Sequence, residues 1–383
     1  MNRLSLRACA ALCGLWSVFA ACAEAVAPPV PTGPSVKVPI YFLMDANTGQ
    51  VFAEALADER ASPASLTKIM AVYVIAHELG QGNIKLEDPV TISENAWRMG
   101  GSQMFIEVGK QVAVKDLLMG IIVQSGNDAS VALAEHVSGT EEAFTDLMNQ
   151  HAARLGMRNS HFIDASGLDQ PEHYSTARDL GILSAALIRD FPEVYSWFKV
   201  HEFTFNGIKQ PNRNRLLYRD PSVDGIKTGF TDDAGYCLAA SALRDGMRLV
   251  SVVMKAESEK QRTAATQALL SFGFRSYKTH RLYEAHKPLA QARIWKGQAK
   301  AADLGLVEDL YVTVPRNRYA DLKAAMDINP RLMAPLPKGG QGGVLKVTLG
   351  DQELLERPLV ALKEVAEAPI YRRWIDELWM LVQ

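Results

Sequence analysis

The sequence is poor in cysteine, in net charge and in long apolar runs, and each shortage excludes a class of protein. Four cysteines among 383 residues are too few for a disulfide scaffold. The chain carries 41 basic against 43 acidic side chains, which excludes the usual strongly basic nucleic-acid binder. No segment beyond the N-terminus approaches 18 uninterrupted apolar residues, so we expect a soluble body. The length predicts about two domains.

The N-terminal segment has the pattern of an export signal. Arg3 and Arg7 form a small basic region, and the apolar run that follows is short and ends in small residues. This predicts a secretory signal peptide over residues 1–25, removed from the mature protein. An uncleaved anchor and a lipoprotein site at Cys22 are the alternatives. Residues 26–37 are a Pro-rich lead-in.

The position of the cysteines supports export. Three of the four, Cys9, Cys13 and Cys22, lie in the segment predicted to be removed, so only Cys237 remains, in an apolar strand. A mature protein with one thiol cannot form an internal disulfide, and its core has to hold it together unaided.

The body alternates between helical and strand patterns. Ser62 and Pro63 predict a helix start, with Ser62 as N-cap, and Gly80 predicts its end. Further helices are predicted over residues 114–123, 128–137, 141–155, 176–189 and 259–272. Strands are predicted over residues 39–45, 51–55, 236–242, 247–254, 310–314, 344–349 and 353–360.

A change of pattern near residue 277 predicts a domain boundary. Residues 38–277 mix helices and strands, and residues 278–365 form a small β-rich domain. Residues 366–383 form an amphipathic helix, whose two tryptophans on the apolar face suit a bilayer interface. The alternative is a helix that docks on its own domain or on a partner. The predicted apolar face consists of Ile370, Tyr371, Trp374, Ile375, Leu378, Trp379, Leu381 and Val382.

The first candidate for chemistry is a serine and a lysine three residues apart, Ser65 and Lys68. On a helix the two side chains share a face. A lysine buried beside a hydroxyl can lose its proton, because desolvation penalises the ammonium, and can then activate the serine without a histidine. Alone the motif is weak, because Ser196 and Lys199 form a second copy.

Two further motifs follow the first. Ser125-Gly126-Asn127 lies in a short break between two apolar helices, where a loop can push a hydroxyl and an amide into a cleft. Lys227-Thr228-Gly229 is predicted as a loop before the strand that begins at Tyr236. Its lysine and threonine could bind a carboxylate, and its glycine lets a substrate backbone approach closely.

The order and spacing of the three motifs carry the identification. Ser125 lies 60 residues after Ser65, and Lys227 another 102 residues on, as in penicillin-recognising serine enzymes. The sequence resembles the serine-type D-alanyl-D-alanine carboxypeptidases, the low-molecular-mass penicillin-binding proteins of Gram-negative bacteria. Further stretches that resemble this family are residues 63–70, 124–128, 202–208, 223–229 and 357–360.

The resemblance implies a mixed α/β (α+β) fold with a transpeptidase/β-lactamase-like catalytic domain over residues 38–277. It implies that Ser65 attacks the carbonyl between two D-alanines, with Lys68 as general base. Ser125 and Lys227 would relay the proton to the leaving D-alanine. β-lactams would mimic the substrate and acylate Ser65.

The resemblance also implies residues that bind the substrate. Lys227 and Thr228 would hold the terminal carboxylate, and the backbone N–H groups of Ser65 and Phe230 would form the oxyanion hole. Phe230 stands where many relatives carry a polar side chain. The substrate-binding set so implied is Asn127, Arg213, Lys227, Thr228, Gly229, Phe230 and Arg262.

Other functions fit the residues less well. A class A β-lactamase needs a deacylating glutamate, and residues 162–168 offer none in the required pattern. A D,D-endopeptidase or weak β-lactamase activity at the same site remains an alternative, as does a non-catalytic wall-binding protein. The eight histidines are scattered and none forms His-Glu-x-x-His, so we predict no metal and no cofactor.

The expected partners and location follow from these readings. The substrate would be the pentapeptide stems of peptidoglycan, with β-lactams as inhibitors and no nucleic acid as partner. The signal peptide and tail helix predict a periplasmic enzyme that is peripherally anchored to the outer face of the inner membrane.

Overall fold

The computed structural model describes residues 33–380. The predicted signal peptide over residues 1–25, residues 26–32 of the lead-in, and Leu381 and Val382 of the tail lie outside the described residues.

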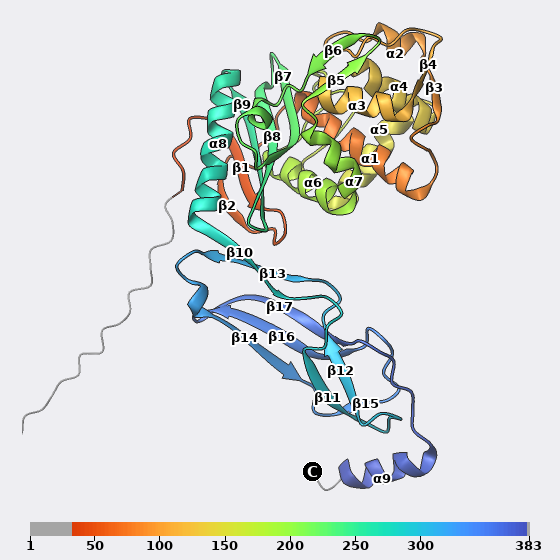
Figure 1. Cartoon of the computed structure of the whole chain (residues 1–383), viewed down its shortest axis with the longest axis vertical. Helices are drawn as coiled ribbons and strands as arrows, with labels where there is room; N and C mark the ends of the chain where they lie inside the picture. The colour runs from red at the N-terminus through yellow and green to blue at the C-terminus, as the bar shows by residue number, and fades with distance from the viewer. Residues whose placement is uncertain (1–32, 381–383) are drawn as a thin grey trace, which may run out of the picture. The chain divides into compact units, whose positions relative to one another are not determined.

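A five-stranded antiparallel sheet organises the first part of the described chain (Figure 1). Its strand order is β2-β1-β9-β8-β7. Side chains alternate between its two faces, because successive residues of a strand point in opposite directions. In β1, Phe42 and Met44 join one apolar core and Leu43 joins another. The strands are β1 Ile40–Asp45, β2 Val51–Ala55, β7 Val223–Thr231, β8 Gly235–Arg244 and β9 Met247–Ala256.

Helices cover both faces of this sheet. α8 packs on one face, and α6 and a cluster of helices pack on the other (Figure 1). Hydroxyl N-caps start α5, α6 and α8, where Thr140, Thr176 and Ser258 accept the amide of the third residue on. The helices are α1 Thr67–Gln81, α2 Glu94–Arg98, α3 Val114–Met119, α4 Asn127–Ser138, α5 Glu141–Leu155, α6 Ala177–Asp190, α7 Pro192–Tyr195 and α8 Glu259–Ser276.

Two small hairpins complete this part. β3 Pro89–Thr91 pairs with β4 Gln111–Ala113, and β5 Glu202–Phe205 pairs with β6 Ile208–Pro211. The second hairpin turns at Asn206-Gly207, where both residues have positive φ, as a two-residue turn between twisted strands requires.

The second part of the chain is rich in β structure, as the alternating pattern predicted. A six-stranded sheet has the order β14-β16-β17-β12-β11-β15, and β10 pairs with β13. Strands β13, β16 and β17 cover the three predicted segments, and the other strands were not predicted. The strands are β10 Tyr277–Tyr283, β11 Ala290–Trp295, β12 Ala301–Gly305, β13 Leu310–Pro315, β14 Leu322–Ile328, β15 Leu332–Met333, β16 Gln341–Leu349 and β17 Gln352–Ala361.

The last described element is α9, Ile370–Met380. Its apolar side chains are exposed, from 49% for Ile375 to 69% for Trp374. Its polar side reaches Lys296, whose backbone N–H donates to Asp376 and whose ammonium pairs with Glu377. Among the described helices, none has the length and apolar character needed to cross a membrane.

The structure corrects the predicted limits of the first helix. Ser62 does not cap it, because the Ser62 hydroxyl donates to Asp169. A 3-10 turn over Ala64–Leu66 precedes α1 instead. At the other end α1 continues through Gly80, and Gly82 ends it in the left-handed conformation.

Candidate active site

Ser65 lies in the 3-10 turn that leads into α1, one turn before Lys68. The Lys68 Nζ lies 3.0 Å from the Ser65 Oγ, so the two side chains share a face as their spacing predicts. The turn begins at Ala64, a non-glycine residue with φ +47°. Such backbone strain is tolerated where the surrounding structure enforces it, often at functional sites.

Lys68 is fully buried and makes two further hydrogen bonds. Its Nζ donates to the Asn127 Oδ1 at 2.7 Å and to the Ser166 carbonyl at 2.6 Å. Burial lowers the pKa of Lys68 to about 7, although the charge of Asp164 raises it. A large fraction of the lysine is therefore neutral near pH 7, which a general base requires.

Ser125 and Asn127 come from the break between α3 and α4. α3 ends at Met119, earlier than predicted, and a wider π-type turn over Gly120–Gln124 follows it. Ser125 then adopts the left-handed conformation, with φ +68°. Its Oγ is buried and has no hydrogen-bond partner among the described residues. The Asn127 amide is fixed at both ends, because its Nδ2 donates to the Gly100 carbonyl at 2.8 Å.

The Lys227-Thr228-Gly229 motif lies inside strand β7 and not in a loop, which corrects the prediction. Thr228 pairs with Leu238 and Gly229 with Cys237 of β8. The tight turn between the two strands explains the error, because it leaves both strands longer than the sequence pattern indicated. The motif therefore stands on a rigid sheet edge.

Gly229 brings this edge against the nucleophile. A Cβ added at Gly229 would lie 3.2 Å from the Ser65 backbone nitrogen and 3.1 Å from the Ala64 Cβ. Even an alanine there would require the strand or the Ser65 turn to shift by a few tenths of an ångström. Glycine therefore lets the strand approach the serine this closely without such a shift.

Lys227 is a second buried lysine. Its Nζ donates to the Thr228 carbonyl at 3.3 Å. Burial lowers its pKa well below the usual range, and the charges of Lys68, Arg213 and Arg262 lower it further. These basic groups together suit an anionic ligand.

The two arginines differ in their surroundings. Arg213 is exposed to solvent at the cavity wall. Arg262 is buried in α8, where its Nη1 donates to the Gly229 carbonyl at 3.0 Å. Arg262 thus braces β7 while it also lines the cavity, and the exposed Arg213 is available to a ligand. Phe230 is 51% exposed, and its ring centre lies 4.4 Å from that of Tyr236.

These residues surround one cavity of about 690 Å³. Lys68 and Lys227 do not line it, because both are buried behind its wall. Among the lining residues, the sequence reasoning singled out Ser65, Ser125, Asn127, Arg213, Thr228, Gly229, Phe230 and Arg262.

One wall of the cavity was missed. Ser166, Gly167 and Leu168 line it, and Asp164 supports them from behind. From the sequence, residues 162–168 were considered only because they lack the deacylating glutamate of a class A β-lactamase. Its signal is an Asp-x-Ser-Gly pattern, which predicts a turn but not its contact with Lys68.

Comparison with known proteins places the chain in a family. A family model described as D-alanyl-D-alanine carboxypeptidase matches residues 25–258. A second, described as penicillin-binding protein 5, C-terminal domain, matches residues 277–367. These matches agree with the family and the fold that the motifs predicted.

Individual relatives cover nearly the whole chain. D-alanyl-D-alanine carboxypeptidase DacA of Escherichia coli K12 is 44% identical over 92% of this chain and 89% of its own. DacC of the same organism is 44% identical over 91% and 89%.

Solved structures agree with these relatives. Penicillin-binding protein 5 of Haemophilus influenzae has a TM-score of 0.82 at 41% identity, covering 88% of this chain and all of that one. The ampicillin-bound form of Listeria monocytogenes penicillin-binding protein D2 has a TM-score of 0.58 at 30% identity, covering 62% and 98%. The chain therefore belongs to the D-alanyl-D-alanine carboxypeptidase family.

Proposed function

We propose that the chain is a serine-type D,D-carboxypeptidase that removes the terminal D-alanine from peptidoglycan pentapeptides. The observation that carries the proposal is the contact between Ser65 and a buried lysine whose pKa lies near 7. The relatives named as D-alanyl-D-alanine carboxypeptidases support the choice of substrate.

Acylation begins at Ser65. When the Lys68 amine is neutral, its two N–H bonds stay on Asn127 and Ser166, and its lone pair faces the Ser65 hydroxyl. Lys68 takes the hydroxyl proton while the Ser65 Oγ attacks the carbonyl between the two D-alanines. The backbone N–H groups of Ser65 and Phe230 stabilise the resulting oxyanion, each worth about 2.7–4 kcal/mol.

Collapse of the tetrahedral intermediate breaks the amide bond. The proton that Lys68 took from Ser65 passes through Lys227 and Ser125 to the leaving D-alanine nitrogen, and Lys68 is then neutral again. The Ser125 Oγ at the cavity supports this role, because it has no hydrogen-bond partner among residues 33–380 and can bond a ligand. Water then hydrolyses the acyl-enzyme and regenerates Ser65.

The substrate carboxylate would lie on the β7 side of the cavity. Thr228 lines the cavity there, with Lys227 buried beside it and Arg213 exposed at the wall. Asn127 would hold the substrate chain. β-lactams present a carboxylate and a strained amide in a similar arrangement, and we propose that they acylate Ser65.

The test is covalent labelling with a fluorescent penicillin. Wild type should be labelled, and Ser65→Ala should not. Ser196→Ala is the matched control, because Ser196 belongs to the second Ser-x-x-Lys copy but its exposed hydroxyl donates to the Glu193 carbonyl. Labelling of Ser65→Ala would refute the nucleophile. A diacetyl tripeptide ending in Lys-D-Ala-D-Ala that releases no D-alanine would refute the activity.

We also propose a catalytic domain over residues 38–277, a β-rich domain over residues 278–365, a cleaved signal peptide over residues 1–25 and a periplasmic location. The C-terminal helix would bind the inner-membrane surface, because α9 exposes Trp374 and Trp379 while Asp376 and Glu377 contact Lys296. Truncation after residue 365 should release an active protein from membranes. Attachment that survives truncation would point to an uncleaved N-terminus.

A further inference from the structure

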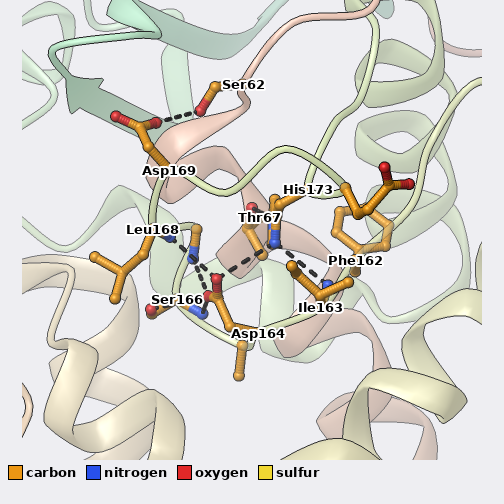
Figure 2. Close-up of polar contacts among 12 residues, drawn as sticks. Ser62, Thr67, Phe162, Ile163, Asp164, Ser166, Leu168, Asp169 and His173 are labelled. Atoms are coloured by element: carbon orange, nitrogen blue, oxygen red, sulfur yellow. Dashed lines mark hydrogen bonds and ion pairs between the residues drawn. The ribbon is translucent and has the colours of Figure 1, made fainter.

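A loop over residues 163–173, between α5 and α6, lies against the nucleophile turn (Figure 2). Gly167 in this loop has φ +89°, and a Cβ added to it would lie 1.8 Å from the Ala64 carbonyl oxygen. The contact is therefore too close for any side chain. The position of the loop and the position of the Ser65 turn are coupled.

The buried Asp164 carboxylate holds the loop in shape. It accepts the backbone N–H groups of Ser166 at 2.7 Å, Gly167 at 2.5 Å and Leu168 at 3.2 Å. It also accepts the Ser166 hydroxyl at 3.0 Å. These bonds fix the Ser166 peptide, whose carbonyl accepts the Lys68 Nζ at 2.6 Å.

His173 joins this carboxylate to the first residue of α1. Its Nδ1 lies 3.3 Å from the Asp164 Oδ2, and its Nε2 lies 2.8 Å from the Thr67 Oγ1 (Figure 2). The Ile163 N–H also points at Nδ1, at 3.3 Å. Nδ1 can either donate to the carboxylate or accept the Ile163 N–H. We assign the proton to Nδ1, where it faces the carboxylate, so Nε2 accepts the Thr67 hydroxyl and the Ile163 N–H is not bonded to Nδ1.

We propose that Asp164 and His173 are positioning residues for acylation. Asp164 holds the Ser166 carbonyl on Lys68 and supplies a negative charge beside that lysine, and His173 aims Asp164 and ties it to Thr67. This inference rests on the proposed function, in which Lys68 is the base for Ser65. Neither residue lines the cavity, so both act through their neighbours.

The charge of Asp164 has a definite effect on Lys68. Burial lowers the pKa of Lys68, and the negative charge of Asp164 opposes that shift. Burial by itself would raise the pKa of Asp164, but its bonds to His173 and to the loop amides lower it below the usual range, so it stays charged. The other charged groups that act on this pair, from the elements packed around it, are Asp128 on α4, Glu141 on α5, Arg213 after β6 and Lys227 on β7.

The substitution Asp164→Asn removes the charge but keeps the shape. If acylation requires neutral Lys68, its rate constant rises with pH through the Lys68 pKa. Without the Asp164 charge that pKa falls, so the midpoint of the rise should move to lower pH by about one unit. The plateau rate should also fall about tenfold or more, because the amide holds the Ser166 turn less well.

The experiment measures the second-order acylation rate constant with a fluorescent penicillin from pH 5 to pH 9. Asp169→Asn is the matched control, because Asp169 belongs to the same loop but accepts the Ser62 and Thr231 hydroxyls. We expect it to change the rate without moving the midpoint. A midpoint for Asp164→Asn that equals that of wild type overturns the electrostatic role.

A second pair of variants tests His173 even if Asp164→Asn does not fold. His173→Gln keeps a donor for Asp164, and His173→Ala removes it. We expect His173→Gln to acylate at least about fivefold faster than His173→Ala, and equal rates would overturn the aiming role. Failure of wild type to be labelled at Ser65 would refute the proposed function instead, so the two failures are distinguishable.

Discussion

Replacing Lys68 with methionine should abolish acylation and yet remove a source of instability. Lys68 is fully buried, and its pKa is lowered from 10.5 to about 7, mainly by burial. That difference corresponds to about 5 kcal/mol, the extra free energy needed to keep the ammonium inside the folded protein. Methionine has a similar volume and no charge.

The sign of the effect follows from proton binding. Between pH 7 and 10.5 the unfolded chain binds a proton at Lys68 that the folded protein does not. The free energy of unfolding of wild type therefore rises with pH in this window, and below it the full cost applies. Relative to Lys68→Met, wild type should gain about 2 kcal/mol from pH 7 to pH 9. The charge of Lys68 also acts on Lys227. Above pH 7 Lys68 is mostly neutral, so Lys227 should titrate in the same way in wild type and in Lys68→Met.

Urea unfolding at pH 7, 8 and 9, followed by circular dichroism, measures this difference. Lys199→Met is the control, because Lys199 is an exposed lysine of the second Ser-x-x-Lys copy. Its difference from wild type should not change with pH. If the difference for Lys68→Met is also constant, Lys68 keeps an ordinary pKa and the argument for a neutral base is wrong.

Three further predictions each concern one residue of the site. Ser125→Ala should lower the acylation rate constant on the order of 10²–10⁴-fold. Because the Ser125 Oγ has no hydrogen-bond partner among the described residues, the free energy of unfolding measured in urea should change by less than about 0.5 kcal/mol. Gly167→Ala places a Cβ 1.8 Å from the Ala64 oxygen at φ +89°, so labelling should be lost and thermal denaturation should show destabilisation of about 1–3 kcal/mol. Phe230→Ala keeps the backbone oxyanion donor, so stopped-flow acylation should slow by less than about tenfold, and a loss of 10²-fold or more would assign the ring a direct role.

Local sequence signals fixed much of the fold correctly. The helix over residues 141–155 was predicted to the residue, because Gly156 supplies the left-handed C-cap and Thr140 the N-cap. The alternating patterns likewise predicted strands β13 and β16. The half-buried character that they indicated fits β16 but not β13, which is mostly buried. Each of these signals acts within a few residues of the chain.

Predictions from the sequence failed where the local structure depends on a residue that is distant in the chain. Ser62 has the sequence of an N-cap, but the Asp169 carboxylate takes its hydroxyl. Strand β7 was read as a loop over its central residues, because its pairing with β8 was not visible in its own composition. Asp164 and His173 were not singled out, because the contacts that link their loop to α1 join residues about 100 positions apart: the Ser166 carbonyl on Lys68, and His173 on Thr67.

The sequence by itself determined the chemical groups and their order: a serine and lysine one helical turn apart, a second serine and amide, and a Lys-Thr-Gly tripeptide. The identities and order of these groups are read directly from the sequence. The spacing of Ser65 and Lys68 also predicts that their side chains lie together, because residues at i and i+3 share a helix face. Only the tertiary structure decided that the three motifs meet at one cavity and that the Lys68 side chain is buried away from solvent. The reason is physical: a pKa depends on desolvation and on neighbouring charges, and the charges that act on Lys68 belong to Asp128, Asp164 and Arg213, which lie about 60 to 145 positions away in the chain.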